Sequence, residues 1–165
     1  MDNISLGTDV IEDLLDQPCW VVDFLPRQVP ANSAGCFSAV EQHYLSYPHA
    51  EEVFRSFAQV ILRLYCYYDL FVGRGYSPDF ERNPSPALLE AEVAGCADGC
   101  RANRHLNIVL SGAQGQRALV VVDGDALNLS VYGADDDLLA LLGPLASSQG
   151  LFLWKSPAQG LPQAR

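Results

Sequence analysis

The segment PHAEEVFRSFAQVILRLYCYYDLFVG, residues 48–73, decides the fold. At helical spacing its polar side chains share one narrow stripe, and apolar side chains fill the rest of the circumference. A helix of this kind has to be covered by other elements on several sides. Glu51 and Glu52 in its first turn complement the positive end of the helix dipole. We therefore predict a long central helix over about residues 49–68, with 65–72 as an alternative strand because it is rich in aromatics.

Shorter elements are expected before and after this helix. CWVVDFL at 19–25 alternates like a strand, and Phe37, Val40 and Tyr44 repeat at helical spacing within a helix over about 37–46. Residues 73–86 contain two glycines and three prolines and read as a loop. A capping Ser85 before Pro86 then predicts a short helix that ends at Gly95.

The last third of the chain predicts a three-stranded meander. Its strands are expected at 105–111, 117–124 and 126–133, the last two joined by an Asp-Gly turn, which is typical of a hairpin. A helix after the aspartates 135–137 and a strand over 151–155 predict a βαβ crossover parallel to the meander.

Together these elements predict an α+β fold. We expect a mixed, mostly antiparallel sheet of four or five strands, packed against the long helix and the shorter ones. The length of 165 residues fits a single domain over 1–155, and the tail 156–165 is expected to be disordered.

The charge is strongly acidic. The formal net charge is −10, and residues 1–60 carry nine acidic but two basic residues. Such a chain gains nothing from the counterion release that drives nucleic-acid binding, and anionic lipid surfaces repel it. We therefore expect neither nucleic acid nor membrane as a partner. A basic protein partner is compatible with this charge, although solubility alone explains it well.

The compartment is expected to be the cytoplasm. The first residues, MDNISLGTDV, lack the basic and apolar regions of a secretory signal, and no apolar run reaches the roughly 20 residues of a membrane span. Five cysteines without a regular framework indicate reduced thiols.

A metal site is one hypothesis for the loop that follows the helix ending at Gly95. Cys96, Cys100 and His105 have the residue types that zinc prefers, with Asp98 between them. The spacing is looser than in structural zinc sites, and incidental thiols in a loop explain it better. We therefore predict no metal and no cofactor.

Two further residues are weak catalytic candidates. Cys36 lies at the expected start of a helix, where the dipole favours a thiolate, but His43 is about 10.5 Å further along the helix axis. An inert core thiol is the favoured interpretation. Asp23 lies in an apolar strand, where burial would raise its pKa, although an edge position facing water or an arginine partner is the favoured interpretation.

An aromatic ligand pocket is a third hypothesis. Tyr65, Tyr68 and Tyr76 lie close together in sequence, and Trp20 is available from the strand at 19–25. Core packing is the default explanation for such a density of rings, so the pocket residues remain candidates.

The leading functional hypothesis is a non-enzymatic protein-binding or regulatory module. It would contact another protein, or a second copy through a sheet edge, and an acidic inhibitor or immunity-type protein is one specific form. The alternatives are a small cysteine-dependent enzyme or metal-binding protein, and a small-molecule sensor with an aromatic pocket. No convergent nucleophile and base can be assembled from the sequence, which favours the first class.

Overall fold

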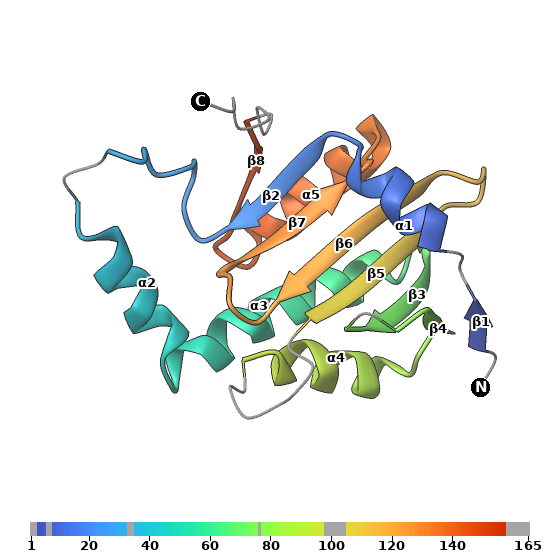
Figure 1. Cartoon of the computed structure of the whole chain (residues 1–165), viewed down its shortest axis with the longest axis horizontal. Helices are drawn as coiled ribbons and strands as arrows, with labels where there is room; N and C mark the ends of the chain where they lie inside the picture. Colours follow the sequence, from blue (N-terminus) through green and yellow to red (C-terminus); the bar gives the residue numbers. More distant parts are fainter. Residues whose placement is uncertain (1–2, 6–7, 33–34, 76, 98–104, 158–165) are drawn as a thin grey trace, which may run out of the picture.

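The computed structural model describes residues 3–5, 8–32, 35–75, 77–97 and 105–157. Five helices and eight strands lie in these residues (Figure 1). The elements in chain order are β1 (Asn3–Ser5), α1 (Thr8–Leu15), β2 (Cys19–Asp23), α2 (Phe37–Leu45), α3 (His49–Leu64), β3 (Asp69–Arg74), β4 (Asp79–Arg82), α4 (Pro86–Gly95), β5 (His105–Ser111), β6 (Arg117–Asp123), β7 (Asn128–Tyr132), α5 (Asp136–Ser147) and β8 (Phe152–Lys155). The α+β class predicted from the sequence is confirmed.

The strands form one sheet in the order β1-β4-β3-β5-β6-β7-β2-β8, and every pair in it is antiparallel. The prediction of four or five strands in a mixed sheet is therefore wrong. β5, β6 and β7 do pair in chain order. β8 pairs with β2, which lies between β8 and β7, so β8 does not join the meander directly.

Two strands were missing from the prediction. β4 lies within residues 73–86, which the prolines and glycines made us assign to a loop, and it is only four residues long. Its Phe80 is 3% exposed and packs on the sheet, whereas Asp79 and Arg82 are exposed and Glu81 is half-buried. Phe80 is therefore the one buried side chain of this strand. β1 has three residues and pairs with β4 at the edge.

α3 is shorter than predicted and is covered on several sides. It ends at Leu64, after which residues 65–68 form a turn and β3 begins, so the aromatic stretch divides between turn and strand. Seven of its side chains are buried. Its polar stripe also faces neighbours, because Gln59 donates to Glu90 of α4 and Arg63 donates to Ser148 near the end of α5.

The two faces of the sheet differ. Buried side chains of α3, α4 and α5 pack together with those of the strands in the main core on one face. On the opposite face α1 crosses the sheet in front of β5 and β6, where Leu14 packs with Phe80, Val109 and Leu119 (Figure 1). Away from α1, strand residues of that face such as Asn107, Val121 and Ser130 are half-buried.

The core role of α3 predicts that replacing Phe54 on α3 destabilises the protein far more than replacing Phe37 on α2. The rings of Phe54 and Phe57 meet edge to face at 5.5 Å and are fully buried. Phe54→Ala should lower the free energy of unfolding by about 3–5 kcal/mol. Phe37→Ala on α2 should change it by about 0.5 kcal/mol or less, because Phe37 is exposed. Urea unfolding monitored by circular dichroism measures both, and equal losses would contradict this division between core and surface.

Candidate functional site

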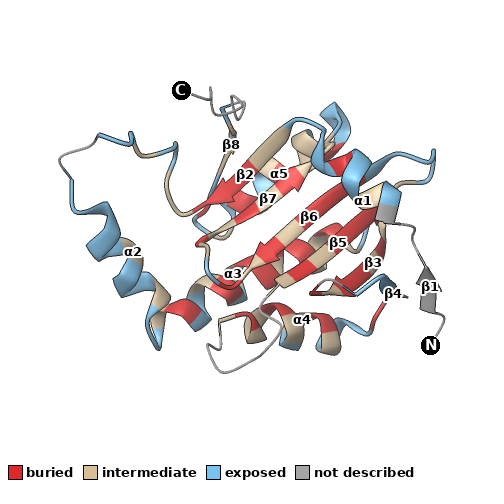
Figure 2. Ribbon diagram, in the orientation of Figure 1, coloured by how far each residue is buried: buried red, intermediate tan, exposed pale blue. Residues whose placement is uncertain are grey.

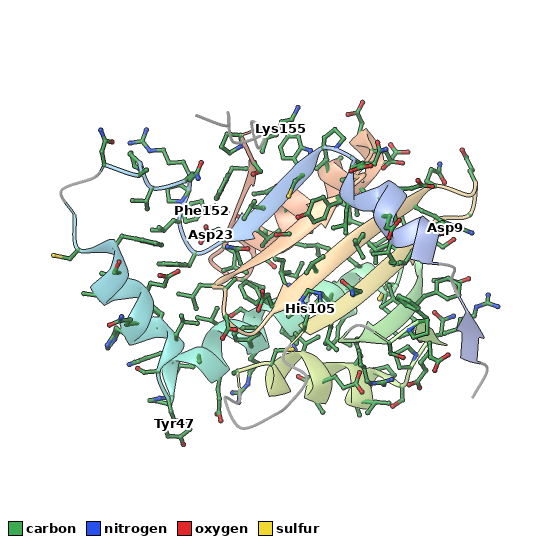
Figure 3. The ribbon with its side chains drawn as sticks, viewed as in Figure 1. Asp9, Asp23, Tyr47, His105, Phe152 and Lys155 are labelled. Carbon is green, nitrogen blue, oxygen red and sulfur yellow. The ribbon has the colours of Figure 1, made fainter. Side chains whose placement is uncertain are left out.

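α2 projects from the body of the protein and none of its residues is buried. It exposes Phe37, Val40 and Tyr44 at positions that share one side of the helix, and Tyr47 follows at its end. Their exposed fractions are 36%, 43%, 37% and 82%. We call these four residues the α2 surface. Figure 2 shows the helix almost entirely exposed beside a largely buried sheet, and Figure 3 shows Tyr47 at the corner between α2 and α3.

The C-terminal half of α2 holds the helix to the body. The ring of Tyr44 lies 5.2 Å from that of Phe24, just after β2. His43 and His49 pack ring against ring at 4.2 Å across the corner to α3. The N-terminal half, with Phe37 and Val40, is reached through the long connection after β2 and extends away from the sheet (Figure 1). The exposed apolar residues therefore belong to a helix that is fixed at one end.

Asp23 lies at the end of β2, next to Phe24, on which Tyr44 of α2 packs (Figure 3). It is 9% exposed, and its Oδ1 accepts a hydrogen bond from the backbone N–H of Leu25 at 3.0 Å. Burial raises the pKa of Asp23, the backbone hydrogen bonds of Leu25 and Phe24 oppose that rise, and the charge of Glu41 on α2 adds to it. The favoured expectation of an edge carboxylate facing water is thus replaced by a buried carboxylate.

The catalytic candidates do not meet. Cys36 is exposed at the N-terminal cap of α2, where its side chain makes no capping hydrogen bond, so the expectation of an inert core thiol is wrong. His43, the base considered for it, packs against His49. Asp23 lies at the end of β2, and its carboxylate accepts a hydrogen bond from the backbone N–H of Leu25.

The metal candidates fall into different surroundings. Cys96 is buried and its Sγ donates to the Glu92 carbonyl at 3.4 Å. His105 begins β5 opposite Asp123, with Nε2 3.1 Å from Asn107 Oδ1. Cys100 and Asp98 lie outside the described residues. Within the described part of the chain no three potential ligands gather to hold a metal ion.

The aromatic candidates also separate. Trp20 and Tyr65 pack against the main core, and the Tyr65 hydroxyl donates to the Pro84 carbonyl at 3.1 Å. Tyr76 lies outside the described residues. Tyr68, just after α3, lines an open cavity of about 380 Å³.

A second cavity, of about 630 Å³, lies beside the end of α1. Leu15, Cys19, Tyr132 and Lys155 contribute to its walls. Burial raises the pKa of the Cys19 thiol, and hydrogen bonds, the largest from the Tyr132 side chain, oppose that rise. Cys19 is therefore less prone than an ordinary cysteine to form the thiolate that nucleophilic chemistry requires.

The α2 surface was not foreseen as a site. The repeat of Phe37, Val40 and Tyr44 was recognised, but the same repeat is typical of a helix face that packs on a core. Only the position of α2 relative to the sheet distinguishes the two cases.

Comparisons with known proteins give no relative: no family model, no curated protein and no solved structure matches this chain. Among the described residues, no helix is both long enough and apolar enough to cross a membrane. The fold and the site are thus those of an α+β domain with a helix that projects from one end.

The raised pKa of Asp23 predicts a pH-dependent difference in stability. The carboxyl group of Asp23 binds its proton more tightly in the folded state than in the unfolded chain. The stability that this protonation contributes is therefore fully present below the ordinary carboxyl pKa and is lost as the pH rises through the pKa of the folded state. Asp23→Asn keeps an oxygen for the Leu25 N–H and removes the charge. We expect the variant to melt above the parent at neutral pH and at the same temperature near about pH 3.

Asp13→Asn, at an exposed position on α1, controls for the loss of one negative charge in these thermal melts. A lower melting temperature for Asp23→Asn at neutral pH, with Asp13→Asn unchanged, would contradict the destabilising role of the buried charge.

Proposed function

We propose that this protein is a non-enzymatic protein-binding module that inserts the α2 surface into an apolar groove, with a basic rim, on another protein. The observation that carries this proposal is that α2 buries none of its own residues while it exposes Phe37, Val40, Tyr44 and Tyr47. Single exposed apolar residues are ordinary, but four on one short helix and the turn after it form a patch.

The form of the patch fits a known way of recognising a groove. Phe37, Val40 and Tyr44 are spaced i, i+3 and i+7, the spacing with which amphipathic helices anchor in hydrophobic grooves. A helix of nine residues is marginal without tertiary packing. A partner that covers α2 would therefore stabilise the helix as well as bury its apolar side chains.

The charge around the patch favours a basic partner. Glu51 and Glu52, four and five residues after Tyr47, are exposed in the first turn of α3, and Glu41 lies half-buried on α2 itself. These carboxylates would repel a second acidic copy and attract a basic surface, which raises the rate of association and selects the partner. An inhibitor or immunity-type role against a basic protein is the specific form that this charge supports.

The other classes have less support. Cys36 is exposed at the start of α2, whereas the imidazole of His43 packs against that of His49 at the other end of the helix. The proposal requires no cofactor. Cys19, Cys36 and Cys66 are free thiols in the part of the chain that the structure describes, which supports the proposal of a reducing compartment such as the cytoplasm.

Site-specific photocrosslinking tests the proposal. With benzoylphenylalanine in place of Val40, we expect one predominant adduct with a basic protein, which the unlabelled parent chain competes away. The same probe at the exposed Ala140 on α5 should give no such adduct. The identified protein is then purified and its affinity measured directly. An adduct between two copies of this chain, or none at Val40, would contradict the proposal.

Two matched variants locate the interface in that affinity measurement. Phe37→Ser should weaken binding by more than about tenfold, as expected for an anchor residue. Phe152→Ser removes a phenylalanine of similar exposure from the edge strand β8 and should leave the affinity unchanged. The opposite result would place the interface at the sheet edge.

A further inference from the structure

A cavity with a distinctive chemical lining lies at the end of α3 opposite to α2. Its volume is about 380 Å³, and it lies between the turn after α3, the β5–β6 turn and the start of α5. Its lining includes two tyrosines, two aspartates, a glutamine and a leucine that matter for the chemistry, namely Tyr67, Tyr68, Asp135, Asp137, Gln114 and Leu141.

The charge of this lining is negative. No lysine or arginine belongs to the walls of the cavity as described. Arg117 lines a narrow recess behind it, which shares Tyr68 and Asp135 with the cavity. Asp137 lines the cavity but not that recess.

Helix capping explains part of this arrangement but not all of it. Asp135 Oδ1 accepts the backbone N–H of Leu138 at 2.8 Å, and Asp136 and Asp137 complement the dipole of α5. Capping does not require two tyrosines and an apolar side chain around the same carboxylates. Burial raises the pKa of Tyr68, and the charges of Asp135 and Asp137 raise it further, so the ring lies within the field of both.

Hydrogen bonds hold two walls of the cavity in place. The backbone N–H groups of Tyr67 and Tyr68 both donate to the Leu64 carbonyl, at 2.9 and 3.1 Å. In the β5–β6 turn, Gln116 Nε2 donates to Gln114 Oε1 at 3.3 Å, and the Gln114 N–H donates to Gln116 Oε1 at 3.2 Å. The backbone of these two turns is therefore held in place without a ligand, which lowers the entropic cost of ordering them on binding.

We propose that this cavity binds an amine or guanidinium cation, carried either by a small molecule or by a basic side chain of a protein. Aromatic faces attract cations, and carboxylates accept charge-assisted hydrogen bonds from N–H donors. Leu141 offers a contact for the aliphatic chain that bears such a group. The site is separate from the α2 surface, since the 16 residues of α3 place about 24 Å between its ends.

Nuclear magnetic resonance titration of the ¹⁵N-labelled full chain tests this site. The probes are butylamine and butylguanidine, with n-butanol as the uncharged control. We expect saturable shifts for the amides of Gly112, Gln114 and Gln116 with both cations and none with the alcohol. Capped tripeptides with a central lysine or arginine identify the source, because tighter binding of a peptide than of the free cation favours a protein side chain.

Two neighbouring aspartates provide the matched variants. Asp137→Asn should weaken cation binding roughly two- to fivefold, the range of an exposed ion pair. Asp136→Asn removes the same charge from the same helix turn but does not line the cavity, so it should change binding less. Equal losses in the two variants, shifts that do not saturate, or equal binding of the alcohol would overturn the proposal. None of these outcomes depends on the α2 partner.

Discussion

The burial of α3 is the constraint on which the rest of the structure depends. Its apolar side chains cover most of the circumference, so the sheet alone cannot shield it, and α4 and α5 cover its remaining sides. The polar stripe of α3 also contacts its neighbours, because Gln59 donates a hydrogen bond to α4 and Arg63 donates one to the residue after α5. The helices α3, α4 and α5 therefore lie on one face of the sheet, and of the described helices α1 is the one that packs on the other face.

The ends of α3 are where this packing stops, and both proposed sites lie there. At the N-terminal end, α2 turns away at the His43–His49 corner and presents apolar side chains to solvent. At the C-terminal end, Tyr67 and Tyr68 leave the helix and meet the acidic start of α5. This acidic protein would thus have two sites suited to basic groups. The α2 surface would bind the basic surface of a partner protein, and the cavity at the other end of α3 would bind a single cation.

Local patterns in the sequence predicted most of the helices and strands, but not the short strands β1 and β4, and they could not predict which distant strands pair. The Asp-Gly turn and the alternation around it place β6 and β7, and the apolar circumference places α3. The insertion of β2 between β7 and β8 joins segments more than 100 residues apart, which no local pattern encodes. The burial of Asp23 and the exposure of α2 depend on where their elements lie in the fold, so neither could be predicted from residue types alone.

Hydrogen exchange of the backbone amides tests most directly the claim that α3 is the core and α2 an unpartnered helix. We expect the amides of α3 to exchange only through global unfolding, whereas those of α2 exchange far faster through local opening. The residues Ala50 to Leu64 and Phe37 to Leu45 are compared in the free protein by mass spectrometry of peptides. Protection of α2 equal to that of α3 would show that the helix is already packed, and would contradict the account.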